Sequence, residues 1–308
     1  MPFNITILGC SSAIPTTTRN PSAQLVNLLG RFFLIDCGEG TQIQLRKNKI
    51  KIQKIDHICI SHLHGDHYLG LIGLISTMNL LGRKKELTIY CPRGLDKIID
   101  LHFKLSYSRL SYSLNIVELK SNILTKLFED DVCELYSFQL KHRIPCWGFK
   151  LIEKERPKKI IKSMIDKFNI PFSEIKYIKS GSDFINDRGQ VIVNSRLTKD
   201  SYKPRSYAYC SDTYYFQSIV NYISNVDLLY HEATFHSSLS DVAKSTFHST
   251  SADAARVAKQ GDVGELIIGH FSSRYKNLDL LKKDAESIFK NVHLAVEGKT
   301  WKIKKKIK

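Results

Sequence analysis

The chain has 308 residues, of which 43% are hydrophobic and 25% charged, and this composition excludes collagen-like and disordered proteins. Its 46 Lys and Arg residues exceed its 30 Asp and Glu residues, so the net charge is +16. Such an excess favours a polyanionic partner: nucleic acid, an acidic membrane surface or a phosphorylated substrate. The seven cysteines are odd in number and contain no CxxC pair, which argues against a disulfide framework and indicates a reducing compartment.

Short runs of β-branched and aromatic residues predict strands in the N-terminal third of the chain, at residues 3–8, 24–26, 32–36, 55–61 and 87–91. A helix is predicted after His67, because Leu71, Leu74, Ile75 and Met78 follow a spacing of three and four residues. A strand therefore leads into a helix through the segment SHLHGDH.

The sequence contains neither a signal peptide nor an apolar run of about 18 residues. This absence predicts a cytoplasmic protein without a membrane segment.

Further strands are predicted where Tyr136, Phe138 and Leu140 alternate with polar residues, and at residues 206–210 and 266–268. Strands interleaved with helices indicate a layered α/β fold. Residues 153–203 form a looser, basic and weakly helical stretch, which we interpret as an insertion in a single domain spanning residues 1–308. The lysine-rich C-terminus is typical of a solvated chain end.

The segment from Ser61 to His67 carries four potential metal ligands. His62 and His64 are two residues apart, so in an extended backbone they point to the same side. Asp66 and His67 can turn toward them because Gly65 allows the chain to reverse into the helix. Imidazole and carboxylate groups without a thiolate suit Zn²⁺, Mn²⁺ or Fe, and a site that is not saturated suits catalysis.

This segment resembles the HxHxDH signature of the metallo-β-lactamase superfamily, and further motifs make the chain similar to the ribonuclease Z family over nearly its whole length. These motifs are LGCSSAIP at 8–15, FLIDCGEGTQ at 33–42, HEATF at 231–235, HSTS at 248–251 and GHFSSRY at 269–275. The resemblance implies a four-layer αβ/βα sandwich with an inserted arm that binds tRNA. It also implies a zinc-dependent endoribonuclease that removes the 3′ trailer from tRNA precursors, leaving a 3′-hydroxyl on the tRNA and a 5′-phosphate on the trailer.

The resemblance further implies two Zn²⁺ ions per subunit and a set of ligands for them. His62, His64 and His142 would bind one ion, Asp66, His67 and His270 would bind the other, and Asp212 would bridge the two. The family assigns the general-base role to the position of Asp66. A homodimer is the usual state of the family, and precursor tRNA is the expected partner.

His248 is the candidate general acid, and Glu232 is its natural partner, since a neighbouring carboxylate raises the pKa of a histidine. The alternative role for the segment around His248 is to cap a helix, because Ser249, Thr250 and Ser251 precede Asp253 and an apolar run. Both roles can hold together. Arg19 and Asn20 follow the first strand, where they could hold a substrate phosphate or belong to an ordinary turn.

The basic insertion supports the arm independently of the resemblance. Residues 153–180 contain eight Lys or Arg residues against four acidic ones, which suits contacts to phosphates, although a solvated surface loop can have the same composition.

Two other classes of function remain open. The first is another hydrolase, either a general metal-dependent phosphodiesterase or a different enzyme of the superfamily. The second is a nucleic-acid-binding module in which metals only stabilise the fold. Small substrates give no reason for the charge excess, and a binding module needs no acid candidate.

Overall fold

The computed structural model describes residues 2–306, and the apolar runs of the N-terminal third pair there into a seven-stranded sheet. Its strand order is β18-β1-β2-β3-β4-β5-β6, with β3 to β6 parallel to one another. The bounds are β1 (Phe3–Gly9), β2 (Ala23–Leu28), β3 (Arg31–Ile35), β4 (Ile55–Cys59), β5 (Leu87–Cys91), β6 (Leu114–Glu118) and β18 (Thr300–Lys302).

A second seven-stranded sheet has the order β17-β16-β15-β14-β9-β8-β7. Strands β14 to β17 are parallel, so the carboxyl ends of β14, β15 and β16 meet at one edge. The bounds are β7 (Thr125–Glu129), β8 (Cys133–Leu140), β9 (Cys146–Glu153), β14 (Ser206–Cys210), β15 (Leu228–Glu232), β16 (Glu265–Gly269) and β17 (Val292–Leu294).

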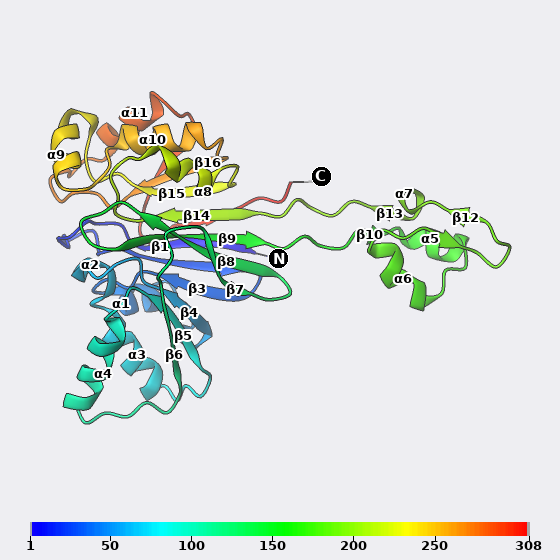
Figure 1. Cartoon of the computed structure of the whole chain (residues 1–308), viewed down its shortest axis with the longest axis horizontal. Helices are drawn as coiled ribbons and strands as arrows, with labels where there is room; N and C mark the ends of the chain where they lie inside the picture. The colour runs from blue at the N-terminus through cyan, green and yellow to red at the C-terminus, as the bar shows by residue number, and fades with distance from the viewer. Residues whose placement is uncertain (1, 307–308) are drawn as a thin grey trace. The chain divides into compact units, whose positions relative to one another are not determined.

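Helices cover the outer faces of the two sheets (Figure 1). The first sheet is covered by α1 (Thr41–Lys47), α2 (Gly65–Tyr68), α3 (Leu71–Leu80) and α4 (Leu95–Leu105). The second sheet is covered by α8 (Val220–Ile223), α9 (Ser240–Ser245), α10 (Ser251–Gln260) and α11 (Asp279–Glu286). Short 3₁₀ turns lie at η1 (Ile52–Lys54), η2 (Gln217–Ile219) and η3 (Ser237–Leu239).

The alternation of side chains along the strands separates two hydrophobic clusters. On β3, Phe33 and Ile35 point into the cluster between the sheets, whereas Leu34 points into the cluster beneath α1, α3 and α4. The predicted helical stripe behaves as expected, because Leu71, Leu74, Ile75 and Met78 are all buried. The layers are therefore helices, sheet, sheet, helices.

Residues 153–205, together with the described tail residues 304–306, form a separate compact unit, which we call the arm. It contains β10 (Lys159–Ile160), α5 (Lys162–Lys167), α6 (Phe172–Lys179), β11 (Phe184–Ile185), β12 (Val191–Ile192), α7 (Asn194–Leu197) and β13 (Thr198–Lys199). Its own small core is made of Ile170, Ile178, Phe184, Ile192 and Leu197. The arm is thus more ordered than the loose stretch that its sequence pattern indicates.

Two expectations from composition can be compared with this fold. All seven cysteines are buried and free, as the absence of a disulfide pattern predicts. Within residues 2–306, no helix has the length and apolar character needed to span a membrane.

Candidate metal centre

The HLHGDH segment folds as the sequence predicts, at the carboxyl end of β4. The strand ends at Cys59, His62 lies in the segment that follows, and His64 is the residue that precedes the first turn of α2. Asp66 and His67 lie within that turn, so all four side chains reach the same rim of the sandwich. His62 and His67 are fully buried, whereas His64 and Asp66 are partly exposed.

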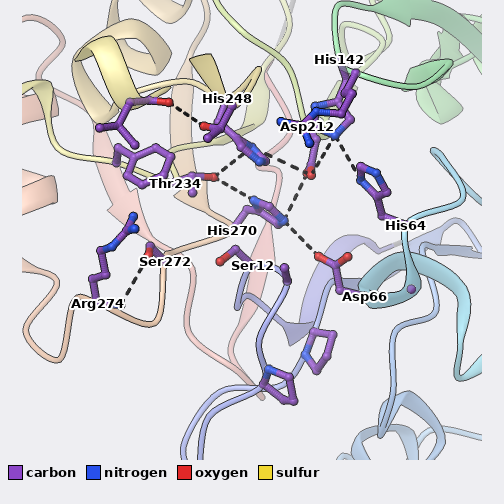
Figure 2. Close-up of a pocket in the computed structure, with 18 of the residues that line it drawn as sticks. Ser12, His64, Asp66, His142, Asp212, Thr234, His248, His270, Ser272 and Arg274 are labelled. Carbon is purple, nitrogen blue, oxygen red and sulfur yellow. Dashed lines mark hydrogen bonds and ion pairs between the residues drawn. The ribbon is translucent and has the colours of Figure 1, made fainter. Parts of the chain in front are cut away.

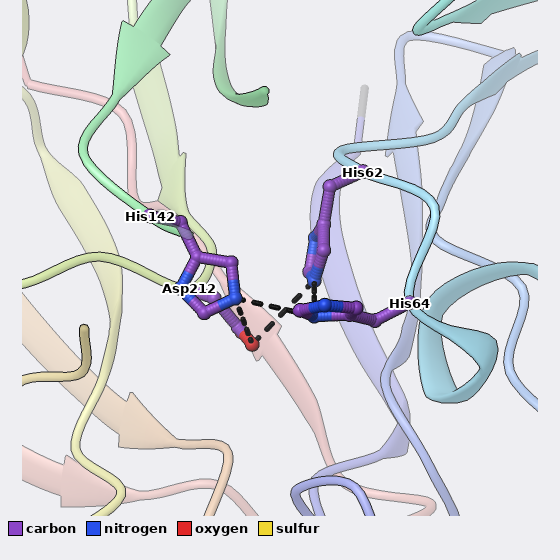
Figure 3. Close-up of side chains that lie close together, drawn as sticks. All are labelled: His62, His64, His142 and Asp212. Carbon is purple, nitrogen blue, oxygen red and sulfur yellow. Dashed lines mark hydrogen bonds and ion pairs between the residues drawn. The ribbon is translucent and has the colours of Figure 1, made fainter. Parts of the chain in front are cut away.

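A first cluster forms where His142, after β8, and Asp212, after β14, approach this rim (Figure 3). The Nδ1 atom of His64 lies 3.1 Å from Nε2 of His62 and 3.2 Å from Nε2 of His142. The Oδ2 atom of Asp212 lies 3.6 Å from Nε2 of His62 and 3.9 Å from Nε2 of His142. The predicted group of His62, His64 and His142 is thus brought together with one oxygen of Asp212.

A second cluster contains Asp66, His67 and His270 and uses the other oxygen of Asp212. Figure 2 shows Asp66, His270 and Asp212 of this group. Oδ2 of Asp66 lies 3.2 Å from Nε2 of His67 and 3.4 Å from Nε2 of His270. Oδ1 of Asp212 lies 3.4 Å from Nε2 of His67 and 3.2 Å from Nε2 of His270. Asp212 therefore presents one carboxylate oxygen to each cluster.

Hydrogen bonds on the far side of the ring orient His62, His67 and His142. Nδ1 of His62 contacts the Ser61 hydroxyl at 3.0 Å, and Nδ1 of His142 donates to the carbonyl of Phe247 at 2.9 Å. Nδ1 of His67 donates to Asp36 at 2.8 Å. In each case Nε2 remains directed into the cluster, which is the arrangement typical of histidine ligands of metals.

The donor set fits a metal cofactor. Nε2 of His67 and Oδ1 of Asp212 are buried and make no hydrogen bond within the described residues, although they face one another. The nitrogen separations of 3.1 and 3.2 Å in the first cluster are close to the edge of a tetrahedron of ligands at zinc, about 3.3 Å. Burial lowers the pKa of His62, His64 and His142, which favours the neutral imidazole that binds metal.

The second cluster carries an excess of negative charge. Burial by itself lowers the pKa of His67, but the carboxylates of Asp66, Asp212 and Asp36 outweigh it and raise this pKa well above its usual value. Carboxylates gathered around one buried imidazole favour a cation at this position. The fold and the two clusters together support a metal cofactor.

Asp36 orients histidines of both clusters, a role that the sequence analysis missed. This fully buried residue follows β3 with a φ of 56°, a left-handed conformation that is uncommon for a residue other than glycine. Its carboxylate accepts hydrogen bonds from His67, from the backbone and hydroxyl groups of Ser61, and from Tyr209. Since the Ser61 hydroxyl also contacts His62, hydrogen bonds link Asp36 to a histidine of each cluster, His67 directly and His62 through Ser61. The strand predicted at 32–36 gave no sign of this turn.

His248 and Glu232 form the pair that the sequence predicts. Nδ1 of His248 lies 2.9 Å from Oε1 of Glu232, and Oδ2 of Asp212 is 3.9 Å away. Burial by itself lowers the pKa of His248, but the charge and hydrogen bond of Glu232, aided by Asp212, raise it to about 9. The helix cap is provided separately by Thr250 and Asp253, which form a capping box on α10. The helix cap is therefore confirmed, and the general-acid role of His248 stays a prediction.

Thr234 couples the same glutamate to the second cluster, and it is another residue that the sequence analysis missed. Its hydroxyl donates to Oε2 of Glu232 at 2.7 Å and lies 2.9 Å from Nδ1 of His270. His270 itself has a φ of 58°, so its backbone turns sharply after β16. Thr234 thereby holds Nε2 of His270 toward Asp66 and Asp212.

The clusters open into a cavity of about 600 Å³ whose walls include Arg143, Phe235, His248 and Arg274 (Figure 2). Arg19 and Asn20, considered above as phosphate contacts, instead hold loops together. Arg19 donates to the carbonyls of Tyr275 and Ser272, and the Asn20 side chain donates to Glu297 at 2.6 Å. The guanidinium groups among the described residues that line the cavity are therefore those of Arg143 and Arg274.

Comparisons with known proteins agree on the fold. A model of the Anti-Pycsar protein Apyc1 family matches residues 3–141, less than half of the chain. The chain is 47% identical to ribonuclease Z of Bacteroides fragilis over 296 residues, which cover 96% of this chain and 97% of the relative. Among solved structures, human tRNase Z, short form (ELAC1), matches with a TM-score of 0.72 at 28% identity, covering 98% of this chain and 99% of that one.

The Bacillus subtilis protein YhfI, described as a metallo-β-lactamase fold protein, matches with a TM-score of 0.69 at 20% identity. The match covers 98% of this chain and 100% of YhfI, and at this identity it shows the fold alone. The predicted αβ/βα metallo-β-lactamase sandwich is therefore confirmed.

The contacts of Asp36 predict its effect on metal binding. Replacement of Asp36 by Asn removes the charge that orients His67 and Ser61, and metal affinity should fall about 10- to 100-fold. Titration of the metal-free protein in competition with a chelator measures this. Asp227→Asn is the matched control, because Asp227 binds the backbone at the opposite ends of β14 and β15. Equal affinities for the Asp36 variant and the wild type would contradict the role.

Proposed function

Because the chain belongs to the ribonuclease Z family, we propose that it removes the 3′ trailer from tRNA precursors with the help of two Zn²⁺ ions. The chain is a hydrolytic endoribonuclease of the metallo-β-lactamase fold. One observation carries the proposal of mechanism: the two oxygens of Asp212 face two separate clusters beside the His248–Glu232 pair. The general phosphodiesterase considered above has no comparable use for the basic arm.

The proposed ligands follow the two clusters. His62, His64 and His142 would hold one ion, Asp66, His67 and His270 would hold the other, and Asp212 would bridge them. A zinc pair bound in this way would lower the pKa of a water toward about 7 and polarise the phosphodiester. The precursor would lie in the cavity, where Arg143 and Arg274 can contact its phosphates.

The protein's own residues would then move the protons. The attacking water approaches phosphorus in line with the ribose 3′ oxygen and gives its proton to Asp66. Burial raises the pKa of Asp66, but His67 and His270 outweigh this and lower it, so the carboxylate is ionised at neutral pH. The bond from phosphorus to the 3′ oxygen breaks, so the tRNA keeps a 3′-hydroxyl and the trailer a 5′-phosphate.

His248 would protonate the departing 3′ oxygen. Its raised pKa keeps it protonated at neutral pH, and Glu232 holds the ring by its Nδ1 atom, leaving Nε2 for the leaving group. Glu232 is itself fixed by the backbone amides of Thr213 and Thr234. The acid is therefore held by a fully buried carboxylate.

We further propose that the protein is a cytoplasmic homodimer. Exposed apolar side chains at the ends of α3 and α4, namely Leu80, Leu81, Leu101, Leu105 and Tyr107, support a surface for self-association. Light scattering after gel filtration should give twice the 35.3 kDa of one chain, and a mass of one chain would refute the dimer.

Incubation of the purified protein with a tRNA precursor that carries a 3′ trailer tests the reaction. A single cut after the discriminator base is expected, with a 3′-hydroxyl on the tRNA, and a chelator should abolish it until zinc is restored. Cleavage that persists without metal would refute the metal role. Hydrolysis of only a small chromogenic phosphodiester would refute the tRNA assignment.

Replacement of His248 by Ala tests the acid. Cleavage of the precursor should slow about 100- to 10,000-fold, since the 3′ oxygen then leaves without a proton. Metal content and tRNA affinity should remain those of the wild type. His102→Ala, on the exposed face of α4, serves as the control and should cleave normally. Loss of bound metal in the His248 variant would instead indicate a structural role.

Replacement of Glu232 by Gln tests the origin of the raised pKa. His248 must be protonated to act, so the cleavage rate of the wild type should fall as the pH rises through about 9. Without the carboxylate the pKa of His248 falls, and this alkaline limb should move to lower pH. The profile of kcat/KM against pH measures the shift. An alkaline limb at the same pH in both proteins would contradict the assignment.

A further inference from the structure

We propose that the C-terminal lysine segment completes a phosphate-binding pocket of the arm and contacts the sugar-phosphate backbone of the RNA. This inference rests on the proposed function, which supplies the RNA, and it assigns a role to residues that the sequence analysis left as a solvated chain end. The pocket, called the basic pocket below, lies wholly within the arm. It is lined by Arg156, Pro157, Lys158, Lys159, Ile160, Lys179, Ser201, Tyr202 and Lys305.

Charge is the first argument. The basic pocket has a volume of about 610 Å³, and its lining includes five cationic side chains and no carboxylate. Arg156 pairs with Glu153 at 2.6 Å, and Lys158 approaches Asp200 at 3.6 Å. The other three lysines, Lys159, Lys179 and Lys305, have no carboxylate partner among residues 2–306. Cations gathered without counter-charges favour a bound anion.

The ring of Tyr202 brings two of these cations together. The ammonium of Lys159 lies 3.8 Å from the ring centroid, and that of Lys305 lies 4.7 Å from it. Both distances fall within the range of cation–π attraction, so the ring stabilises two like charges at one place. Each ammonium keeps hydrogen-bond donors that the ring does not use. These donors suit the non-bridging oxygens of a phosphate.

Backbone contacts place the tail residues in the arm. The amide of Lys203 donates to the carbonyl of Lys306 at 2.9 Å, next to Tyr202 and Lys305. On the other wall, β10 pairs with β13 through Lys159 and Lys199, and the amide of Lys158 donates to the carbonyl of Lys179 at 2.9 Å. The lysines are therefore carried by paired backbone. The last described residues of the chain form one wall of the basic pocket.

The chemistry favours the nucleic-acid backbone over the bases. The described lining offers hydrogen-bond donors and one serine hydroxyl, and its one aromatic ring is already contacted by two ammonium groups. Binding should therefore be independent of sequence and steeply dependent on salt. This separates the basic pocket from the catalytic cavity, whose task is to select one phosphodiester.

Single substitutions in the full-length protein test the basic pocket. Lys305→Ala and Lys159→Ala should each raise the Kd for precursor tRNA several-fold. Each should also reduce the slope of log K against log salt by about 0.9 for one lost phosphate contact in duplex RNA. Lys304→Ala is the matched control, because it removes the same charge from the neighbouring residue, which does not line the basic pocket. Tyr202→Phe should bind like the wild type, whereas Tyr202→Leu should bind like the lysine variants.

Two further readouts separate the outcomes. All variants should hydrolyse a small chromogenic phosphodiester at the wild-type rate, which shows that the metal centre is intact. Lys305 and Lys159 variants with the Kd and salt slope of the Lys304 variant would overturn the inference while leaving the proposed function in place. Weakened binding of inorganic tripolyphosphate without any change for tRNA would also overturn it, since the occupant would then be a small polyphosphate. A wild-type protein that neither binds nor cleaves precursor tRNA would refute both.

Discussion

The proposed chemistry of this protein depends on the carboxylate of Asp212, whose two oxygens face two different clusters. Asp212 lies where β14 ends, and its two oxygens point into two different groups of imidazoles. This position is available because the strands that carry His142, Asp212, Glu232 and His270 all end at the same edge of one sheet, while His62 to His67 come from β4 of the other. The sandwich brings the two edges together, and Asp212 is the point at which they meet.

A second buried carboxylate, that of Asp36, orients the proposed metal ligands through hydrogen bonds. Asp36 binds His67 directly and reaches His62 through Ser61, so it fixes a ring in each cluster. With Asp66, Asp212 and Glu232 it places four acidic side chains in the interior of a chain whose net charge is +16. Negative charge is thus concentrated where cations and the His248 proton are needed, whereas positive charge is concentrated in the arm, where RNA phosphates are expected. In the proposed reaction the buried carboxylates would hold the metal ions and the acid, and the arm would bind the RNA.

Much of this arrangement could be predicted from the sequence because local patterns dictate it. The strand ending before His62, the reversal at Gly65 and the stripe of α3 depend on neighbouring residues, and all were expected. The left-handed turns at Asp36 and His270 were missed, because tertiary contacts stabilise a conformation that neither residue prefers. Tyr136, expected to alternate with polar residues in line with Phe138, is only partly buried, whereas Phe138 is fully buried. The meeting of Lys305 with Tyr202 joins residues about a hundred positions apart, and no local signal predicts it.

The central claim is that Asp212 divides its oxygens between two metal ions, and anomalous diffraction from crystals of the zinc-loaded protein tests it most directly. Data collected on both sides of the zinc absorption edge should give two peaks, one among His62, His64 and His142 and the other among Asp66, His67 and His270. Both peaks should lie against the Asp212 carboxylate. A single peak, or two peaks of which only one contacts Asp212, would contradict the account.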